Sequence, residues 1–88
     1  MLFSISYDLN KPGQDYPELY SKIKDLGDWC HPLDSTWFVE TNLSASKVRE
    51  TLNSVMDSSD ALLVVKASAP GAWFGLDDKV SQWLKDNL

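Results

Sequence analysis

Two hydrophobic periodicities alternate along the chain, and their order constrains the fold more than any other feature of the sequence. Leu2–Asp8 alternates apolar and polar side chains, which is typical of a strand with one buried face. In Tyr16–Leu26 the apolar residues recur three and four positions apart, which is the spacing of one helix face. Ser35–Thr41 alternates again, Ser44 is the expected N-cap of a second helical pattern, and Ala61–Val65 is a continuous apolar run. We expect this last run to be a strand that is covered on both faces or lies at the centre of a sheet.

Turn-forming residues separate these segments. Asn10-Lys11-Pro12-Gly13 is a strong loop signal after the first strand. Trp29–His31 is a short segment interrupted by Pro32, and it can form a hairpin with Ser35–Thr41 around Pro32-Leu33-Asp34. Asp57–Asp60 ends the second helix.

The resulting order is strand, helix, strand, strand, helix, strand. It predicts a ferredoxin-like α+β domain of βαββαβ type, in which a four-stranded antiparallel sheet carries two helices on one face. Because the chain has 88 residues, we assign residues 1–88 to a single domain with its core in 1–68. Residues 69–88 add an aromatic turn and a C-terminal helical tail, for which Asp77 is the expected N-cap.

Charge and cysteine content narrow the class of protein. Eight basic and 13 acidic side chains give a net charge of −5, which disfavours nucleic acid as a partner because such binding depends on Lys and Arg. Cys30 is the single cysteine, so an internal disulfide is excluded and a reducing compartment is favoured. The longest apolar run is far shorter than the ~20 residues that a membrane-spanning helix needs. We therefore expect a cytoplasmic protein with no membrane partner.

Asp8 is the leading candidate for chemistry. A carboxylate at the end of the first strand, directly before a loop, can hold a hard cation or act as an acid or base. The same carboxylate can instead cap its own loop by accepting hydrogen bonds from the backbone N–H of Asn10 or a later residue. The residues alone leave both interpretations open.

Cys30 and His31 are neighbours, but adjacent residues of a strand point to opposite faces, so they cannot share one site there. We expect Cys30 to be a small core side chain and His31 to be a solvated edge residue. Asp34-Ser35-Thr36 after a proline is typical turn chemistry rather than a nucleophile beside an acid.

Four tryptophans in a short chain indicate either core and interface residues or a platform for stacking nucleic-acid bases. The negative charge balance favours core or interface. We name four aromatic residues as binding or interface candidates: Trp37, Trp73, Phe74 and Trp83.

Three segments, Ile5–Leu9, Leu33–Val39 and Asp60–Val65, resemble a known group of proteins. The pattern is similar to short bacterial and phage proteins of the SinR family, and to the related CRISPR-associated protein two and virulence-associated protein D. The resemblance covers residues 1 to about 66. It implies a ferredoxin-like fold and a homodimer joined through sheet edges or the C-terminal segment. In the latter two families the acid that ends the first strand can hold a divalent metal for nuclease activity, one acid from each subunit, and Asp8 is the matching residue.

The function expected from these observations is a non-catalytic, dimeric binding or interaction module without a cofactor. The alternative is a Mg²⁺- or Mn²⁺-dependent nuclease, acting on RNA, in which Asp8 of two subunits shares the ion. A pocket for a small nucleotide at the dimer interface is a third hypothesis.

Overall fold

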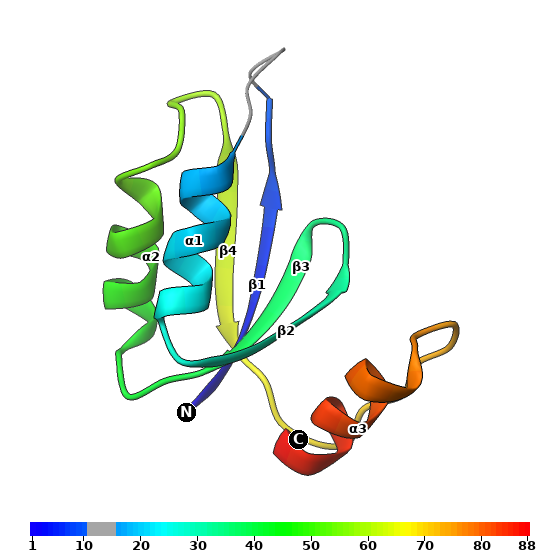
Figure 1. The fold of residues 1–88 in the computed structure, drawn as a ribbon. Coiled ribbons are helices and arrows are strands. Elements are labelled where there is room, and N and C mark those ends of the chain that lie inside the picture. Colours follow the sequence, from blue (N-terminus) through cyan, green and yellow to red (C-terminus); the bar gives the residue numbers. More distant parts are fainter. Residues whose placement is uncertain (11–15) are drawn as a thin grey trace.

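The computed structural model describes residues 1–10 and 16–88. Four antiparallel strands form one sheet in the order β2-β3-β1-β4, and three helices accompany it (Figure 1). Along the chain the elements are β1 (Leu2–Asp8), α1 (Pro17–Asp25), β2 (Asp28–Leu33), β3 (Thr36–Glu40), α2 (Ala45–Asn53), β4 (Ala61–Lys66) and α3 (Asp78–Asn87). The domain is a small α+β unit consistent with a ferredoxin-like type of fold. Of the loop expected at 10–13, only Asn10 is among the described residues.

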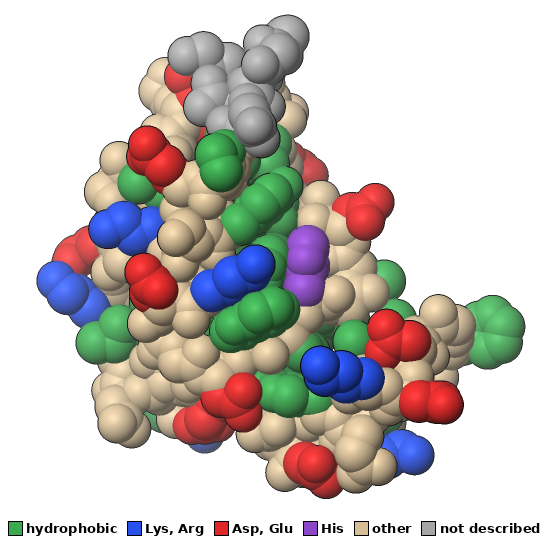
Figure 2. All heavy atoms as spheres, viewed as in Figure 1, with side chains coloured by type: hydrophobic (Ala, Val, Ile, Leu, Met, Phe, Trp, Pro, Cys, Tyr) green, Lys and Arg blue, Asp and Glu red, His purple; other side chains and the backbone are tan. Residues whose placement is uncertain are grey.

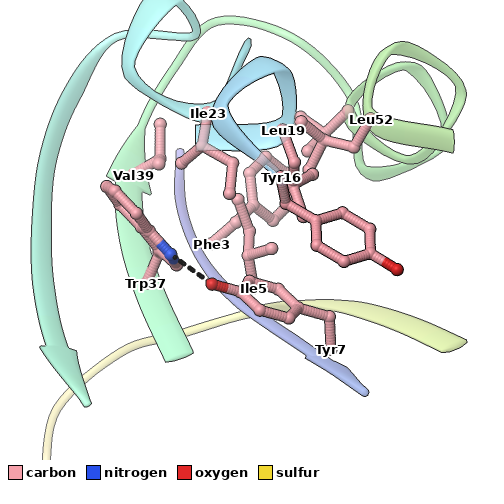
Figure 3. Packing of buried hydrophobic residues seen from close by; sticks show 10 residues of the cluster. Phe3, Ile5, Tyr7, Tyr16, Leu19, Ile23, Trp37, Val39 and Leu52 are labelled. Carbon is pink, nitrogen blue, oxygen red and sulfur yellow. Dashed lines mark hydrogen bonds between the residues drawn. The ribbon is translucent and has the colours of Figure 1, made fainter. Parts of the chain in front are cut away.

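Helices α1 and α2 lie side by side on one face of the sheet, and the hydrophobic core fills the space between them and the strands (Figures 1 and 3). Alternate residues of the two central strands point toward the helices, as the alternation in the sequence predicts. The core consists of Phe3, Ile5, Tyr7, Tyr16, Leu19, Ile23, Trp37, Val39, Val48 and Leu52.

The two helices begin where the sequence predicts them, for different local reasons. Pro17 occupies the first turn of α1, where its fixed φ suits a helix and its missing N–H has no intrahelical partner to lose. Ser44 caps α2, because its side-chain oxygen accepts a hydrogen bond of 3.1 Å from the backbone N–H of Lys47. Gly27 follows α1, and a Cβ atom there would lie 2.0 Å from the backbone oxygen of Glu40. Only glycine allows the chain to pass so close to β3.

Strand β2 runs through Pro32, where the sequence analysis placed a turn. The turn lies instead at Asp34 and Ser35. The proline is tolerated because β2 is an edge strand, and the ladder with β3 is irregular between Cys30 and Leu33.

Strand β4 is the second edge of the sheet, so the prediction that Ala61–Val65 lies at the centre or is covered on both faces is wrong for the single chain. Leu62 and Val64 pack against the core. Leu63 and Val65 point to the other face, where they remain 58% and 45% exposed. Helices α1 and α2 cover one face only, and the sequence pattern does not reveal that the second face lacks a layer over β4.

The C-terminal helix α3 contacts β2 and lies on the side of the sheet opposite to α1 and α2. Leu84 of α3 is buried, and so is Cys30 of β2, whose partner in the ladder is Phe38. This helix covers the β2 side of the second face and leaves the β4 side open. Within the described ranges, no helix has both the length and the apolar character needed to cross a membrane.

Candidate functional site

The uncovered face of the sheet is apolar along β4. The register pairs Ser4 with both Phe38 and Val65, and Ser6 with Leu63, so these side chains share the face that points away from α1 and α2. Leu63 and Val65 are large, exposed and adjacent on one side of the strand. We call the surface formed by Ser4, Ser6, Phe38, Leu63 and Val65 the open face.

A cleft of about 660 Å³ lies between the open face and residues 67–88, which we call the arm. Leu33, Phe38 and Val65 line it on the side of the sheet. From the arm, the apolar lining residues are Ala67, Pro70, Ala72, Trp73, Phe74, Leu76, Leu84 and Leu88. Lys66 is the one charged residue among the described residues that line the cleft. Depletion of charge together with aromatic side chains is typical of the buried centre of a protein interface.

Side-chain hydrogen bonds order the part of the arm at the start of α3. Asp77 caps α3 by accepting a hydrogen bond of 2.8 Å from the backbone N–H of Val80, as the sequence predicts. Trp73 Nε1 donates to Ser81 Oγ over 3.1 Å, and this bond attaches the turn before α3 to the helix. Between these anchors Phe74 is 99% exposed, and Gly75 has the positive φ of 83° that glycine adopts without strain. The loop before α3 projects from the body of the domain (Figure 1).

The four aromatic candidates have different environments in the structure. Phe74 is fully exposed, whereas Trp73 and Trp83 are half-buried. The indole nitrogen of Trp83 is buried and has no acceptor among the described residues. Trp37 is only 2% exposed and donates a hydrogen bond of 3.0 Å from Nε1 to the Tyr7 hydroxyl (Figure 3). Trp37 is therefore a core residue and presents no surface to a partner.

His31 and Trp29 form an aromatic surface over Trp37, on the same side of the sheet as α1. The His31 ring stacks on the Trp37 ring, with centroids 3.8 Å apart and planes 10° apart. The Lys24 ammonium lies 5.0 Å from the centroid of the Trp29 ring, within the range of a cation–π contact. Figure 2 shows the histidine beside a strip of hydrophobic side chains on this face. Trp29 is thus an exposed tryptophan, although it is not among the four aromatic candidates named from the sequence. The sequence did not show whether Trp29–His31 forms a strand, because Pro32 interrupts the pattern.

Cys30 points to the other side of the sheet, so the prediction that Cys30 and His31 do not share a site is confirmed. Burial raises the pKa of the Cys30 thiol to about 11, although a hydrogen bond with the Phe38 backbone acts in the opposite direction. A thiol with such a pKa is protonated at neutral pH and is a poor nucleophile. Cys30 is buried, as predicted for a small core side chain.

Asp8 is exposed at the end of β1, opposite Ala61 in the ladder and on the same face as Ser6. A shallow hollow of about 240 Å³ surrounds it, lined by Ser6, Tyr7, Ala61, Leu62 and Leu63 as well as Asp8. Among the described residues, no three His, Cys, Asp or Glu side chains are grouped closely enough to hold a metal ion. A metal at Asp8 would therefore need ligands beyond the described part of one chain.

The loop that follows β1 is held by Asp60, a role that the sequence analysis missed. The Asn10 backbone N–H donates to Asp60 Oδ1 over 2.8 Å, so the interpretation in which Asp8 caps Asn10 is wrong. Residues 11–15, where Asp8 was also expected to cap, lie outside the described part. Asp60 Oδ1 accepts a second bond of 2.9 Å from the Tyr16 hydroxyl, and Oδ2 accepts one of 2.8 Å from the Asp57 backbone N–H.

These bonds affect the titration of Asp60. Desolvation of the carboxylate would raise its pKa, but the hydrogen bonds from Asn10, Asp57 and Tyr16 outweigh it, and the pKa is lowered from its ordinary value. The turn sequence 57–60 suggests a carboxylate that bonds its own backbone. The partners Asn10 and Tyr16 are 50 and 44 residues away and could not be found from local pattern.

Comparison with known proteins supports the fold alone. No family model matches the chain, and no curated protein matches it. Among solved structures, it is similar to a hypothetical protein, TT1823, from Thermus thermophilus, with a TM-score of 0.66 and 17% sequence identity. The similarity covers 85% of this chain and 90% of the other.

Proposed function

We propose that the protein is a non-catalytic, dimeric interaction module of ferredoxin-like βαββαβ type with a C-terminal helical tail, and that it acts in the cytoplasm. The observation that carries this proposal is the open face of β4. An edge strand with one solvated face is expected to alternate apolar and polar residues. Strand β4 instead has apolar residues on both faces, and Leu63 and Val65 are left in water. A second copy that covers this face explains the pattern.

Burial of Leu63 and Val65 in such a contact would contribute measurably to the free energy of dimerisation. Complete burial of a Leu or Val side chain contributes about 1.5–3 kcal/mol. Leu63 and Val65 are 58% and 45% exposed, so covering both contributes on the order of 2 kcal/mol for each copy. A twofold dimer uses the same patch on both copies, which doubles this contribution. Phe38 and Val65 of the open face also line the apolar cleft, so the cleft extends the apolar surface next to Leu63.

Charge supports a protein partner over nucleic acid. The chain carries a net charge of −5, and association with phosphate backbones depends on Lys and Arg. The cleft beside the open face has one charged residue among its described lining residues, Lys66. A surface of this kind suits an apolar protein contact.

The test is the oligomeric state of the full chain, measured by sedimentation velocity over a range of concentrations. The variant Leu63→Lys places a charge on the open face, whereas Leu43→Lys places it at a leucine that is 37% exposed in the segment between β3 and α2. We expect the wild type and Leu43→Lys to be dimers and Leu63→Lys to be a folded monomer by circular dichroism. A wild type that stays monomeric at every concentration contradicts the proposal.

A second candidate function rests on the position of Asp8. This carboxylate is exposed on the face that also carries Leu63, and no described residue makes a hydrogen bond or ion pair with it. In a dimer whose twofold axis passes near the end of β1, two Asp8 carboxylates would meet and could hold Mg²⁺ or Mn²⁺ for cleavage of RNA. Among the described residues of one chain, no group of three His, Cys, Asp or Glu side chains could hold the ion, so this function also draws on the dimer.

Labelled RNA incubated with either metal separates the two functions. Asp8→Asn removes the proposed ligand, and Asp34→Asn is a matched change of an exposed acid in the β2–β3 turn. Cleavage by the wild type and by Asp34→Asn, but not by Asp8→Asn, would establish the nuclease. Equal inactivity of all three supports the interaction module.

A further inference from the structure

We infer that, in the dimer, Phe74 of each arm inserts into the cleft of the partner copy. This inference rests on the proposed function and identifies the contact that completes the interface. It uses two features that one chain leaves open to solvent: a fully exposed aromatic ring and an apolar cleft.

The Phe74 ring is presented by an ordered segment. The bond from Trp73 Nε1 to Ser81 Oγ fixes the residue before it, and the Asp77 cap fixes the start of α3 after it. At Gly75, a Cβ atom would meet no atom within 4 Å apart from those of its two chain neighbours, so open space surrounds this residue. The ring therefore projects into solvent although apolar surface lies close by. Transfer of a Phe ring from water to an apolar environment is favourable, because it removes apolar surface from water.

The cleft has the size and chemistry to accept the ring. Its volume of about 660 Å³ falls within the range of about 300–1,000 Å³ that is typical of ligand sites. Its wall on the sheet side contains Phe38, Leu33 and Val65. Phe38 provides a ring for an aromatic pair, which stabilises the contact beyond the gain from area burial. Ser4 and Thr36 of the lining are polar but uncharged, and Lys66 is the one charged side chain among the described lining residues.

A second copy of the chain is the occupant that the geometry favours. Val65 belongs both to the open face and to the wall of the cleft, so the cleft is continuous with the proposed interface. A ring and a cleft on the same chain form a self-complementary pair under a twofold axis, and both contacts then form in one closed dimer. Phe74 belongs to the lining of its own cleft, but the ring does not fill that cleft, since it is 99% exposed in the single chain.

The first experiment measures the dimer dissociation constant of full-length variants by sedimentation equilibrium. Because Phe74 is fully exposed, Phe74→Asp and Phe74→Leu are expected to fold as the wild type does. We expect Phe74→Asp to raise the dissociation constant at least tenfold and Phe74→Leu to raise it less. Leu43→Asp, at an exposed leucine outside the open face, is the control and is expected to leave it unchanged. A dimer that is unaffected by Phe74→Asp overturns the insertion but leaves the proposed function intact.

The second experiment identifies which copy supplies the ring. Phe74→Cys is made in one tagged chain and Leu33→Cys in a chain with a different tag, and the two are mixed under mild oxidation. Cys30 is kept, because burial raises its pKa to about 11 and makes it unreactive. A disulfide between the two differently tagged chains supports the insertion. If the double variant Phe74→Cys/Leu33→Cys forms this disulfide only within one chain, the arm folds onto its own cleft and the inference is wrong.

Discussion

We expect the hydrogen bond between Trp37 and Tyr7 to contribute to the free energy of unfolding by an amount that can be estimated from the structure. The Tyr7 hydroxyl accepts from Trp37 Nε1 over 3.0 Å and donates to the Asp34 backbone oxygen over 3.2 Å. Burial raises the pKa of the Tyr7 phenol, with the bond from Trp37 acting in the opposite direction, so the hydroxyl keeps its proton at neutral pH. Tyr7→Phe removes this hydroxyl and almost nothing else.

The expected cost arises at Trp37. Its side chain is 2% exposed, so the indole N–H would remain buried without an acceptor. Such a group costs about 1–3 kcal/mol. Asp34 is an exposed residue, and its backbone oxygen also lies 3.1 Å from His31 Nε2, so the loss of the Tyr7 donor at this oxygen adds little to the cost. We expect a decrease of about 2 kcal/mol in the free energy of unfolding, which corresponds to roughly 8–16 °C in Tm for a domain of this size.

The assay is urea denaturation followed by circular dichroism at one protein concentration, because dimerisation also contributes to apparent stability. A double-mutant cycle with Trp37→Phe isolates the pair. In the Trp37→Phe background, position 37 has no indole N–H that could be left without an acceptor. There, Tyr7→Phe is expected to lower the free energy of unfolding by less than about 0.5 kcal/mol relative to Trp37→Phe alone. A loss below about 0.5 kcal/mol in the wild-type background, or strictly additive effects, would refute the reasoning.

Three further predictions test other parts of the structure. Because the pKa of Asp60 is lowered in the folded state, its carboxylate stabilises the fold fully above the unfolded-state pKa of about 3.9. This stabilisation is lost as the pH falls through the folded-state pKa. Asp60→Asn should therefore weaken the dependence of Tm on pH between about 5 and 2. Gly27→Ala should lower Tm, because its Cβ would lie 2.0 Å from a backbone oxygen, whereas Gly71→Ala meets a flexible Leu88 side chain at 3.2 Å and should change Tm little. Cys30 should react with a thiol reagent far more slowly in the native protein than in urea, and equal rates would show that the thiol is not protected.

Apart from β2, which continues through Pro32, the positions of the elements followed from local physics and were predictable. Alternation in β1 and β3, helical spacing with a Ser44 cap in α2, and the Asp77 cap of α3 each depend on residues that are near one another in sequence. The same reasoning placed Cys30 and His31 on opposite faces, because the side chains of a strand alternate.

The surroundings of the candidate site residues were harder to predict from the sequence. Periodicity shows that Trp37 and Val39 share a face, but it does not show which face α1 and α2 cover. Trp37 was therefore named as an interface residue although it is in the core. Trp29 was not named, although it is exposed, because Pro32 obscured the edge strand that carries it.

The sequence by itself determined the order of strands and helices, the caps and the inward alternation, since these depend on neighbours within a few residues. Only the tertiary structure decided that β4 is an edge with an uncovered face, that Asp60 holds Asn10 and Tyr16, and that a cleft separates the sheet from the arm. These features depend on contacts between residues far apart in the chain. Local preference does not specify them, because the pattern of one segment does not record which distant strands, helices or loops pack against it.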